Sequence, residues 1–241
     1  MSSNDAKTKE SERKQTRYAV SDDCRLRASI MIRSSEADSA SKDWPGTLVD
    51  MSASGAHIQI SMAAVAYKGD SCVLKLAHGG VKTEMRGTLA HYICSARYSV
   101  CGVKFDYASA QELQPYLKAI VASATLKAGE AAVESGRYRE EYRGPGQTKL
   151  VVWRDNKPER ALVGFDYTMG RYGAVLTAAG PDMLKNKAEV RFKAAPTEKG
   201  DTGAPLSQAQ EAEARWEFSL AASNLPAAIA PDIRKFLRLV S

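Results

Sequence analysis

A chain of 241 residues can form one large domain or two small ones, and its 44% hydrophobic and 26% charged residues are ordinary for a globular protein. No apolar run approaches the roughly 18 to 20 residues that span a bilayer. The polar N-terminus also lacks the apolar segment of a secretory signal, so a soluble, cytoplasmic protein is expected. The net charge of +6 is spread without long basic runs, which argues against a nucleic-acid coat protein and leaves a small anionic ligand or an acidic partner open.

The first half of the chain predicts short strands. Residues 1–12 are polar, without apolar periodicity, and are expected to form a flexible arm. Residues 24–32 alternate with a period near two, which favours a strand, whereas 34–46 has a loop composition. Further strands are predicted at 46–50, 55–61, 71–77, 83–94 and 99–106, joined by turns at 51–54, 68–70, 78–80 and 95–97. Such short strands with close turns indicate an antiparallel barrel or sandwich.

A helix is predicted after the last of these strands. Apolar residues recur at three- and four-residue steps: Leu113, Leu117, Ile120, Val121 and Leu126. Ser109 and Glu112 have the spacing of a capping box. The helix is expected to run to about Ser135-Gly136, because glycine can end a helix.

The remainder of the chain resembles a degenerate repeat of the first part. Arg139 and Arg143 repeat the R-x-x-x-R spacing of Arg13 and Arg17, and Gly173-Ala174 aligns with Gly55-Ala56. Strands are predicted at 149–153, 162–165, 174–177, 188–193 and 215–220, with a disordered-looking segment over 196–210 and a closing helix over 229–240. This internal repeat predicts a tandem of two similar domains.

Two short motifs in the first half carry chemistry. Arg13 and Arg17 form R-x-x-x-R on the arm, and residues 50–55 read D-x-S-x-x-G. The planar guanidinium of arginine can grip a phosphate or the O6/N7 edge of guanine with two hydrogen bonds, and it can stack on a purine. A carboxylate such as Asp50 can accept from guanine N1–H and N2–H₂, which rejects adenine. Ser52 can bond guanine or phosphate, and Gly55 permits a turn conformation that brings backbone N–H groups close to a ligand.

The order of these motifs resembles that of PilZ domains. In that family the arginine motif precedes the first strand, D-x-S-x-x-G lies between later strands, and G-[VI]-x-F, here Gly102 to Phe105, precedes a final helix. The resemblance covers roughly residues 10–121. It implies a six-stranded antiparallel barrel that acts as a cyclic di-GMP receptor. The roles that it implies are carried by five residues: Arg13 and Arg17 as clamps on phosphate and guanine, Asp50 and Ser52 as guanine contacts, and Gly55 as the shape of the turn.

The expected fold class is mainly β, with two six-stranded antiparallel PilZ-type β-barrels, each followed by a C-terminal α-helix. The expected domains are a flexible arm over 1–12, a PilZ domain over 13–135 and a degenerate PilZ-like domain over 136–241. In the second domain Thr168 stands at the aspartate if Gly173 matches Gly55, and Arg171 stands at the glycine if Asp166 matches Asp50. We expect this domain to bind the nucleotide poorly or not at all and to serve as an output or dimerisation surface.

The resemblance implies a bacterial, non-catalytic second-messenger receptor that acts by domain or partner rearrangement, with an unidentified downstream protein and a possible homodimer. The alternative is a PilZ-type adaptor that works by protein contacts without nucleotide. A third reading is an RNA-binding barrel that uses Arg13, Lys14 and Arg17.

Other chemistry has weak support in the sequence. A hydrolase triad of Asp50, Ser52 and His57 is disfavoured, because all three lie within eight residues and no G-x-S-x-G elbow is present. Walker and Rossmann phosphate loops are absent from the sequence, and His57 is expected to be a barrel-wall side chain. Neither the cysteines nor the histidines have metal-ligand spacing, and we expect no metal site and no disulfide: Cys24, Cys72, Cys94, Cys101, His57, His78 and His91.

Overall fold

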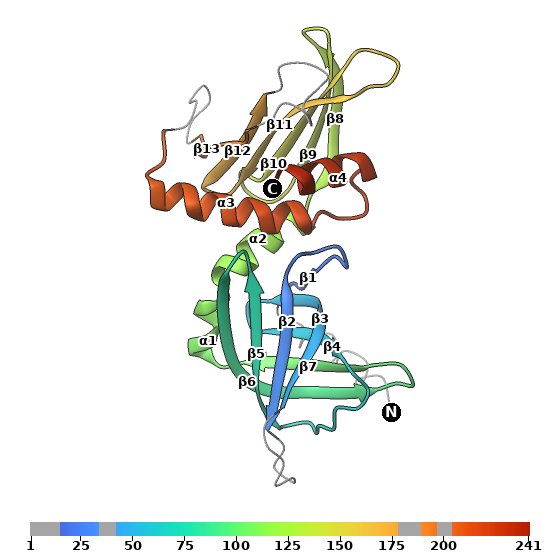
Figure 1. Cartoon of the computed structure of the whole chain (residues 1–241), viewed down its shortest axis with the longest axis vertical. Coiled ribbons are helices and arrows are strands. Elements are labelled where there is room, and N and C mark those ends of the chain that lie inside the picture. Colours follow the sequence, from blue (N-terminus) through green and yellow to red (C-terminus); the bar gives the residue numbers. More distant parts are fainter. Residues whose placement is uncertain (1–14, 34–41, 178–188, 197–203) are drawn as a thin grey trace, which may run out of the picture. The chain divides into compact units, whose positions relative to one another are not determined.

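The computed structural model describes residues 15–33, 42–177, 189–196 and 204–241 (Figure 1). The chain divides into two compact units, each built from more than one stretch of sequence. Unit 1 comprises the described residues of Met1–Ala19, Ala28–Leu76 and Thr83–Gln114. Unit 2 comprises those of Val20–Arg27, Ala77–Lys82 and Pro115–Ser241.

Unit 1 contains a closed antiparallel barrel of six strands, which confirms the fold predicted for the first half. The strands are β2 (Arg27–Arg33), β3 (Lys42–Ser52), β4 (Gly55–Ile60), β5 (Ser71–His78), β6 (Val81–Cys94) and β7 (Ser99–Phe105). Their order is β3-β2-β5-β6-β7-β4, and the pairing of β3 with β4 closes the ring. A short strand, β1 (Tyr18–Ala19), pairs with the C-terminal end of β3.

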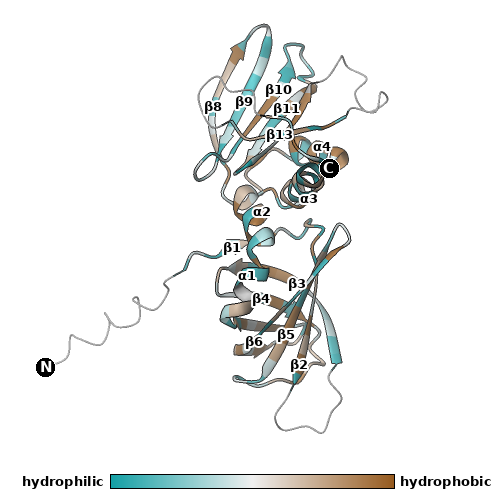
Figure 2. Cartoon of the chain, turned by 90° about the vertical axis from the view of Figure 1, so that its left-hand side faces the viewer, coloured by the Kyte–Doolittle hydropathy of each residue, from teal (hydrophilic) through white to brown (hydrophobic). Residues whose placement is uncertain are grey.

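Alternating burial along these strands fills the barrel with apolar side chains. In Figure 2 the strands of the barrel carry brown, apolar stretches together with teal, polar ones. The largest fully buried side chains of the barrel are Ile30, Leu48, Met51, Ile58, Leu74, Leu76, Met85 and Leu89. Removing these side chains from water supplies the main driving force for closing the barrel.

Two β-bulges interrupt this alternation. One lies between Leu48 and Asp50 in β3, and the other lies between Leu89 and His91 in β6. Residues two apart on a regular strand share a face, so without the bulges Asp50 and His91 would point inward beside the buried leucines. The extra residue reverses the alternation and turns both polar side chains to the outer face of the barrel.

Several predicted boundaries in the first half are wrong. The loop was predicted over 34–46, but residues 42–46 belong to β3. The rest of the predicted loop, which follows β2 after Arg33, lies outside the described residues. The predicted arm over 1–12 lies outside the described residues. The predicted helix begins earlier and ends sooner than expected, as α1 (Tyr107–Glu112) and α2 (Gln114–Ala124). Ser109 therefore lies inside α1, whose N-cap residue is Asp106.

The segment after α2 is a β-hairpin instead of a continuing helix. β8 (Lys127–Glu134) pairs with β9 (Arg137–Arg143). Between them Ser135 and Gly136 have φ angles of 50° and 73°. Two consecutive residues with positive φ are typical of the tight turn of a β-hairpin. Ser135 and Gly136 therefore form the turn between β8 and β9, and they do not end a helix.

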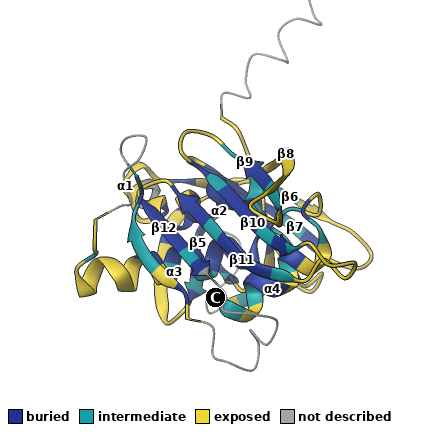
Figure 3. Cartoon of the chain, turned by 90° about the horizontal axis from the view of Figure 1, so that it is seen from above, coloured by how far each residue is buried: buried dark blue, intermediate teal, exposed yellow. Residues whose placement is uncertain are grey.

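Unit 2 is built on an open antiparallel sheet. Its further strands are β10 (Lys149–Asp155), β11 (Leu162–Met169), β12 (Tyr172–Thr177) and β13 (Arg191–Ala194). The order is β13-β12-β11-β10-β9-β8, so consecutive strands are neighbours and β8 and β13 are the edges. Figure 3 shows β10 and β11 largely dark blue, whereas every residue of β8 is exposed.

Helices cover one face of this sheet. α3 (Gln208–Ser223) and α4 (Pro231–Val240) share a core with α2 and the strands. Phe218 of α3 stacks on Phe165 of β11 with ring centroids 5.6 Å apart. The hydroxyl of Tyr167 donates to the carbonyl of Ala122 in α2 at 3.1 Å. The sheet and its helices thus have a hydrophobic core of their own.

The expected second barrel is not confirmed, because the described strands of unit 2 form an open sheet. The predicted strand over 215–220 is wrong, since these residues lie in α3. Ser207 caps that helix: its hydroxyl accepts from Gln210 N, and Gln210 Oε1 accepts from Ser207 N at 2.9 Å. The closing helix over 229–240 is confirmed as α4.

Two segments from the first half of the chain belong to unit 2. Val20–Arg27 connects β1 to β2, and Asn224 Oδ1 accepts from Ser21 N at 2.7 Å. The guanidinium of Arg25 donates to the carbonyl of Arg238 in α4 at 2.8 Å. Ala77–Lys82 contains the β5–β6 turn, where Trp216 Nε1 donates to the carbonyl of His78 at 2.9 Å.

Candidate functional site

Strand pairing in unit 1 brings the two sequence motifs together. β1 runs antiparallel to the end of β3, with Tyr18 opposite Met51 and Ala19 opposite Asp50. Arg17 directly precedes β1. A short pairing of two residues therefore places the second arginine of R-x-x-x-R beside the aspartate of D-x-S-x-x-G.

Arg17 and Asp50 form an ion pair on the outer face of the barrel. Arg17 Nη1 donates to Asp50 Oδ1 at 2.6 Å, and the side chains are 39% and 20% exposed. An ion pair of this exposure contributes about 0 to 1 kcal/mol to stability. Each partner can therefore be exchanged for a ligand group at little cost.

His57 is the third member of this cluster. Its Nδ1 lies 2.9 Å from Asp50 Oδ2 and 3.2 Å from Arg17 Nη1. A protonated Nδ1 can donate to the carboxylate, and an unprotonated Nδ1 can accept from the guanidinium, but one nitrogen cannot do both. The structure thus places His57 at the site, whereas the sequence predicted only a barrel-wall residue.

The position of His57 follows from the hairpin that the D-x-S-x-x-G motif forms. Ser52 pairs with Gly55 across a two-residue connection, so Asp50 pairs with His57. The seven-residue separation of Asp50 and His57 was therefore a usable sequence signal, because facing residues of a tight hairpin have adjacent side chains.

His91 lies beside His57 on the same face. The two ring centroids are 5.0 Å apart at an interplanar angle of 59°. A Cβ on Gly102 would lie 2.1 Å from the ring of His91, so the imidazole occupies space that a side chain at 102 would fill. Burial, and then the charges of His57 and Arg17, lower the pKa of His91, while Asp50 acts in the opposite direction.

Ser52 and Gly55 lie in the same hairpin but are buried beneath the cluster. The Ser52 hydroxyl donates to Gly55 O at 3.2 Å and accepts from Ser54 N at 3.4 Å. Ser52 is only 2% exposed. In this arrangement its hydroxyl holds the turn that carries Asp50.

Gly55 is required for close packing of strands. Its φ is not positive, which differs from the turn conformation expected from the sequence. A Cβ at this position would lie 2.3 Å from the backbone oxygen of Val103 in β7. The hairpin is held there further because Phe105 N donates to Ser54 O at 2.9 Å.

Three further arginines were singled out in the sequence: Arg13, Arg139 and Arg143. Arg13 lies outside the described residues. Arg139 and Arg143, the second R-x-x-x-R, lie on β9, and both donate to the carboxylate of Glu141. Burial alone would raise the pKa of Glu141, but these two guanidinium groups lower it below its ordinary value. The second arginine pair is thus occupied by a buried carboxylate of its own unit.

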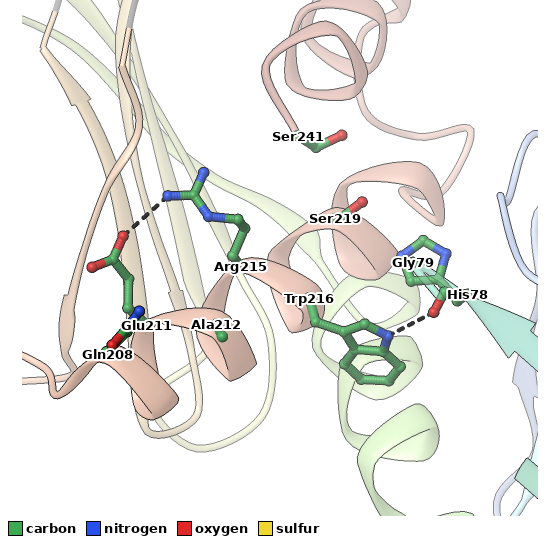
Figure 4. A pocket seen from close by; sticks show the side chains of 9 residues that line it. All are labelled: His78, Gly79, Gln208, Glu211, Ala212, Arg215, Trp216, Ser219 and Ser241. Carbon is green, nitrogen blue, oxygen red and sulfur yellow. Dashed lines mark hydrogen bonds and ion pairs between the residues drawn. The ribbon is translucent and has the colours of Figure 1, made fainter. Parts of the chain in front are cut away.

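A depression of about 660 Å³ in unit 2 is a second candidate site (Figure 4). Its wall includes Arg215 and Trp216 of α3, together with His78 at the end of β5. Arg215 Nη2 donates to Glu211 Oε1 at 3.0 Å, one helical turn away. No sequence motif falls in this depression, whereas the cluster around Arg17 combines residues of two motifs, so the cluster is the stronger candidate.

The described residues contain no group of three or more His, Cys, Asp or Glu side chains that could hold a metal ion. The four cysteines are free thiols. Burial raises the pKa of Cys72 to about 12 and that of Cys101 to about 11. Such thiols stay protonated at neutral pH and are poor nucleophiles.

One known protein family matches a stretch of this chain. The family model described as PilZ domain matches residues 11–122. No curated protein matches the chain. The matched range contains the whole cluster of Arg17, Asp50, His57 and His91, and domains of this family serve for binding instead of catalysis. Across the residues that the structure covers, no helix is long and apolar enough to cross a membrane.

Proposed function

Because residues 11–122 are a PilZ domain, we propose that this chain is a bacterial, cytoplasmic receptor for cyclic di-GMP. The observation that supports this function is the pairing of Arg17 with Asp50 on the outer face of the barrel. The nucleotide carries two phosphates and two guanine edges. A guanidinium and a carboxylate held side by side match these groups in charge and in hydrogen-bonding geometry.

Binding would exchange the ion pair for contacts to the nucleotide. Asp50 would accept from N1–H and N2–H₂ of a guanine, and Arg17 would turn to a phosphate or to the O6/N7 edge. The ion pair that is given up is partly exposed, so its loss costs about 0 to 1 kcal/mol. Hydrogen bonds to charged groups are each worth about 1.5 to 3 kcal/mol, which more than offsets this cost.

Arg13 would supply the second arginine contact. It lies four residues before Arg17, so both guanidinium groups can reach one ligand that lies against the barrel. Binding would thereby select one arrangement of the segment that precedes β1.

The chain itself offers a route from the ligand to unit 2. Arg17 is followed by the two residues of β1, and Val20, the next residue, begins a segment that belongs to unit 2. Ser21 is hydrogen-bonded to Asn224 at 2.7 Å. A change in the arrangement of the arm would therefore act on a segment anchored in unit 2, from which it could pass to a partner protein.

The direct test is isothermal titration of cyclic di-GMP into the intact protein and into an Arg13→Ala/Arg17→Ala variant. We expect saturable binding by the intact protein and a loss of at least about 100-fold in affinity in the variant, because two charge-assisted contacts are removed.

The matched control is Arg33→Ala/Arg97→Ala, which removes the same charge from two exposed positions of the barrel. This variant should bind like the intact protein. Equal losses in both variants would mean that net charge, and not the motif, governs binding.

One observation favours the alternative function, an adaptor that acts through protein contacts without nucleotide. Arg17 and Asp50 already satisfy each other, and the Ser52 hydroxyl is engaged in its own turn. Absence of any heat of binding with the intact protein would favour this adaptor function.

A further inference from the structure

The polar side chains of the site lie in one row that crosses the barrel. Asp50 of β3 pairs with His57 of β4, and His57 pairs with Gly102 of β7. Gly102 pairs in turn with His91 of β6. The row therefore extends from the Arg17–Asp50 pair across three further strands, in the order seen in Figure 1.

The structure creates this row by two departures from a regular sheet. Bulges just before Asp50 and just before His91 turn both residues outward. The missing side chain at Gly102 lets the rings of His57 and His91 approach to 5.0 Å. Bulges of this kind commonly re-aim side chains at functional sites.

Most ring nitrogens in the row have no partner among the residues that the structure describes. Within the described part of the chain, neither nitrogen of His91 nor Nε2 of His57 makes a hydrogen bond, and both rings are partly exposed. Imidazole nitrogens that face solvent beside a guanidinium suit an anionic oxygen, because a neutral ring has one N–H donor and a protonated ring has two.

We propose that His57 and His91 form a second part of this site and contact a phosphate of the nucleotide, with uptake of a proton when it binds. This inference rests on the proposed receptor function and adds to it two residues and a dependence on pH. It does not follow from the R-x-x-x-R or D-x-S-x-x-G motifs, which contain neither histidine.

The charges around the rings set the direction of the pH dependence. His91 faces His57 from β4, Arg17 from the segment before β1 and Asp50 from β3, while Gly102 of β7 presents no side chain. Without ligand, burial lowers the pKa of His91, and its interactions with His57 and Arg17 act in the same direction, which favours the neutral ring. A phosphate beside the ring favours the protonated form and raises the pKa. Because the bound state then holds more protons than the free state, affinity must rise as the pH falls.

The test is titration calorimetry with cyclic di-GMP at pH 6 and pH 8, in buffers of different ionisation enthalpy, which measures the protons taken up. We expect the intact protein to bind about three- to tenfold more tightly at pH 6, since a one-unit rise in pKa corresponds to a factor of ten. His57→Gln and His91→Gln should each bind about tenfold more weakly at pH 6 and should show less proton uptake.

Two further variants separate a phosphate contact from simpler roles. His91→Phe keeps a ring over Gly102 but has no nitrogen, so it should lose the pH dependence as His91→Gln does. Thr88→Ala, at an exposed position on the same strand, should keep it. Each variant is first compared with the intact protein by circular dichroism and thermal unfolding.

The outcomes distinguish this inference from the function on which it rests. Binding that is unchanged in affinity and pH dependence in both histidine variants overturns the inference and leaves the receptor function standing. Full binding and pH dependence in His91→Phe overturns the phosphate contact. No binding by the intact protein at either pH overturns the receptor function, and this inference with it.

Discussion

Glu217 on α3 carries a carboxyl group that is largely buried. It is only 8% exposed, and no hydrogen bond or ion pair to it is found among the described residues. Burial raises its pKa to about 7, with smaller effects from Arg171, Glu213 and Lys118. Removing a carboxylate from water without a partner is costly, so at neutral and alkaline pH this residue opposes folding.

Replacing Glu217 by glutamine should therefore stabilise the protein at high pH. The folded pKa of about 7 exceeds the unfolded value near 4.5, so the stability of the intact protein falls as the pH rises between these values. The difference amounts to about 3 kcal/mol at pH 8 and shrinks towards pH 5. Urea unfolding of both proteins at pH 5 and pH 8 measures it, with Glu211→Gln as the exposed control on the same helix. Parallel pH dependence in all three proteins would contradict the argument.

At the scale of elements, local sequence predicts strands with turns between them better than it predicts where helices stop. The strands of the barrel alternate in burial with a period of two, which the sequence shows directly. The apolar steps from Leu113 to Leu126 continue past the end of α2 because Leu126 belongs to the core of unit 2. The helix was therefore predicted to continue into residues 127–134. These residues form β8 instead, because they pair with β9.

The hairpin of β8 and β9 gives a test of this reading. Ser135 has a φ of 50° and is followed by Gly136 at 73°, which are the angles that Asn-Gly favours. Ser135→Asn should stabilise the protein by a few tenths of a kcal/mol, whereas Gly136→Ala should cost about 1 kcal/mol, because alanine is strained at positive φ. Thermal unfolding measures both. In a helix the alanine variant would be the more stable one, so that ranking would refute the hairpin.

The candidate site was predictable only in part for a related reason. Arg17 and Asp50 belong to motifs that can be read along the chain, and the structure brings them together. His91 lies 34 residues beyond His57, and their contact depends on the β4–β7–β6 register, on a bulge and on Gly102. None of these can be read from local spacing, because register is set by the whole barrel.

At the scale of the whole molecule, the two sequence halves are less alike than their spacing suggests. A Cβ at Gly55 would lie 2.3 Å from a backbone oxygen, whereas the nearest atom to a Cβ at Gly173 would be in the flexible side chain of Lys193, at 3.3 Å. Arg139 and Arg143 bind Glu141 within their own strand. The matched residues thus serve different structural purposes, and a shared spacing did not mean a shared fold.

Ligand binding should alter more of the molecule than the site alone. If cyclic di-GMP orders the segment 13–19, its amides become protected from hydrogen exchange, and the segment Val20–Arg27 changes with them because it continues the same chain. Exchange followed by mass spectrometry with and without ligand measures this. The hairpin of β8 and β9 provides the internal control and should exchange equally in both states. Unchanged exchange over 13–19 at saturating ligand would exclude ordering of the arm.

The discontinuous make-up of unit 2 also fixes an order of events during synthesis on the ribosome. All six strands of the barrel lie before residue 106, so the ring can close while α3 is still untranslated. Ser21 N cannot form its hydrogen bond until Asn224, which is 203 residues further along the chain, has been synthesised. At about 5 to 20 residues per second this delay is about 10 to 40 seconds. During that interval the segment Val20–Arg27 lacks the C-terminal residues with which it forms unit 2, and it is open to chaperones and proteases.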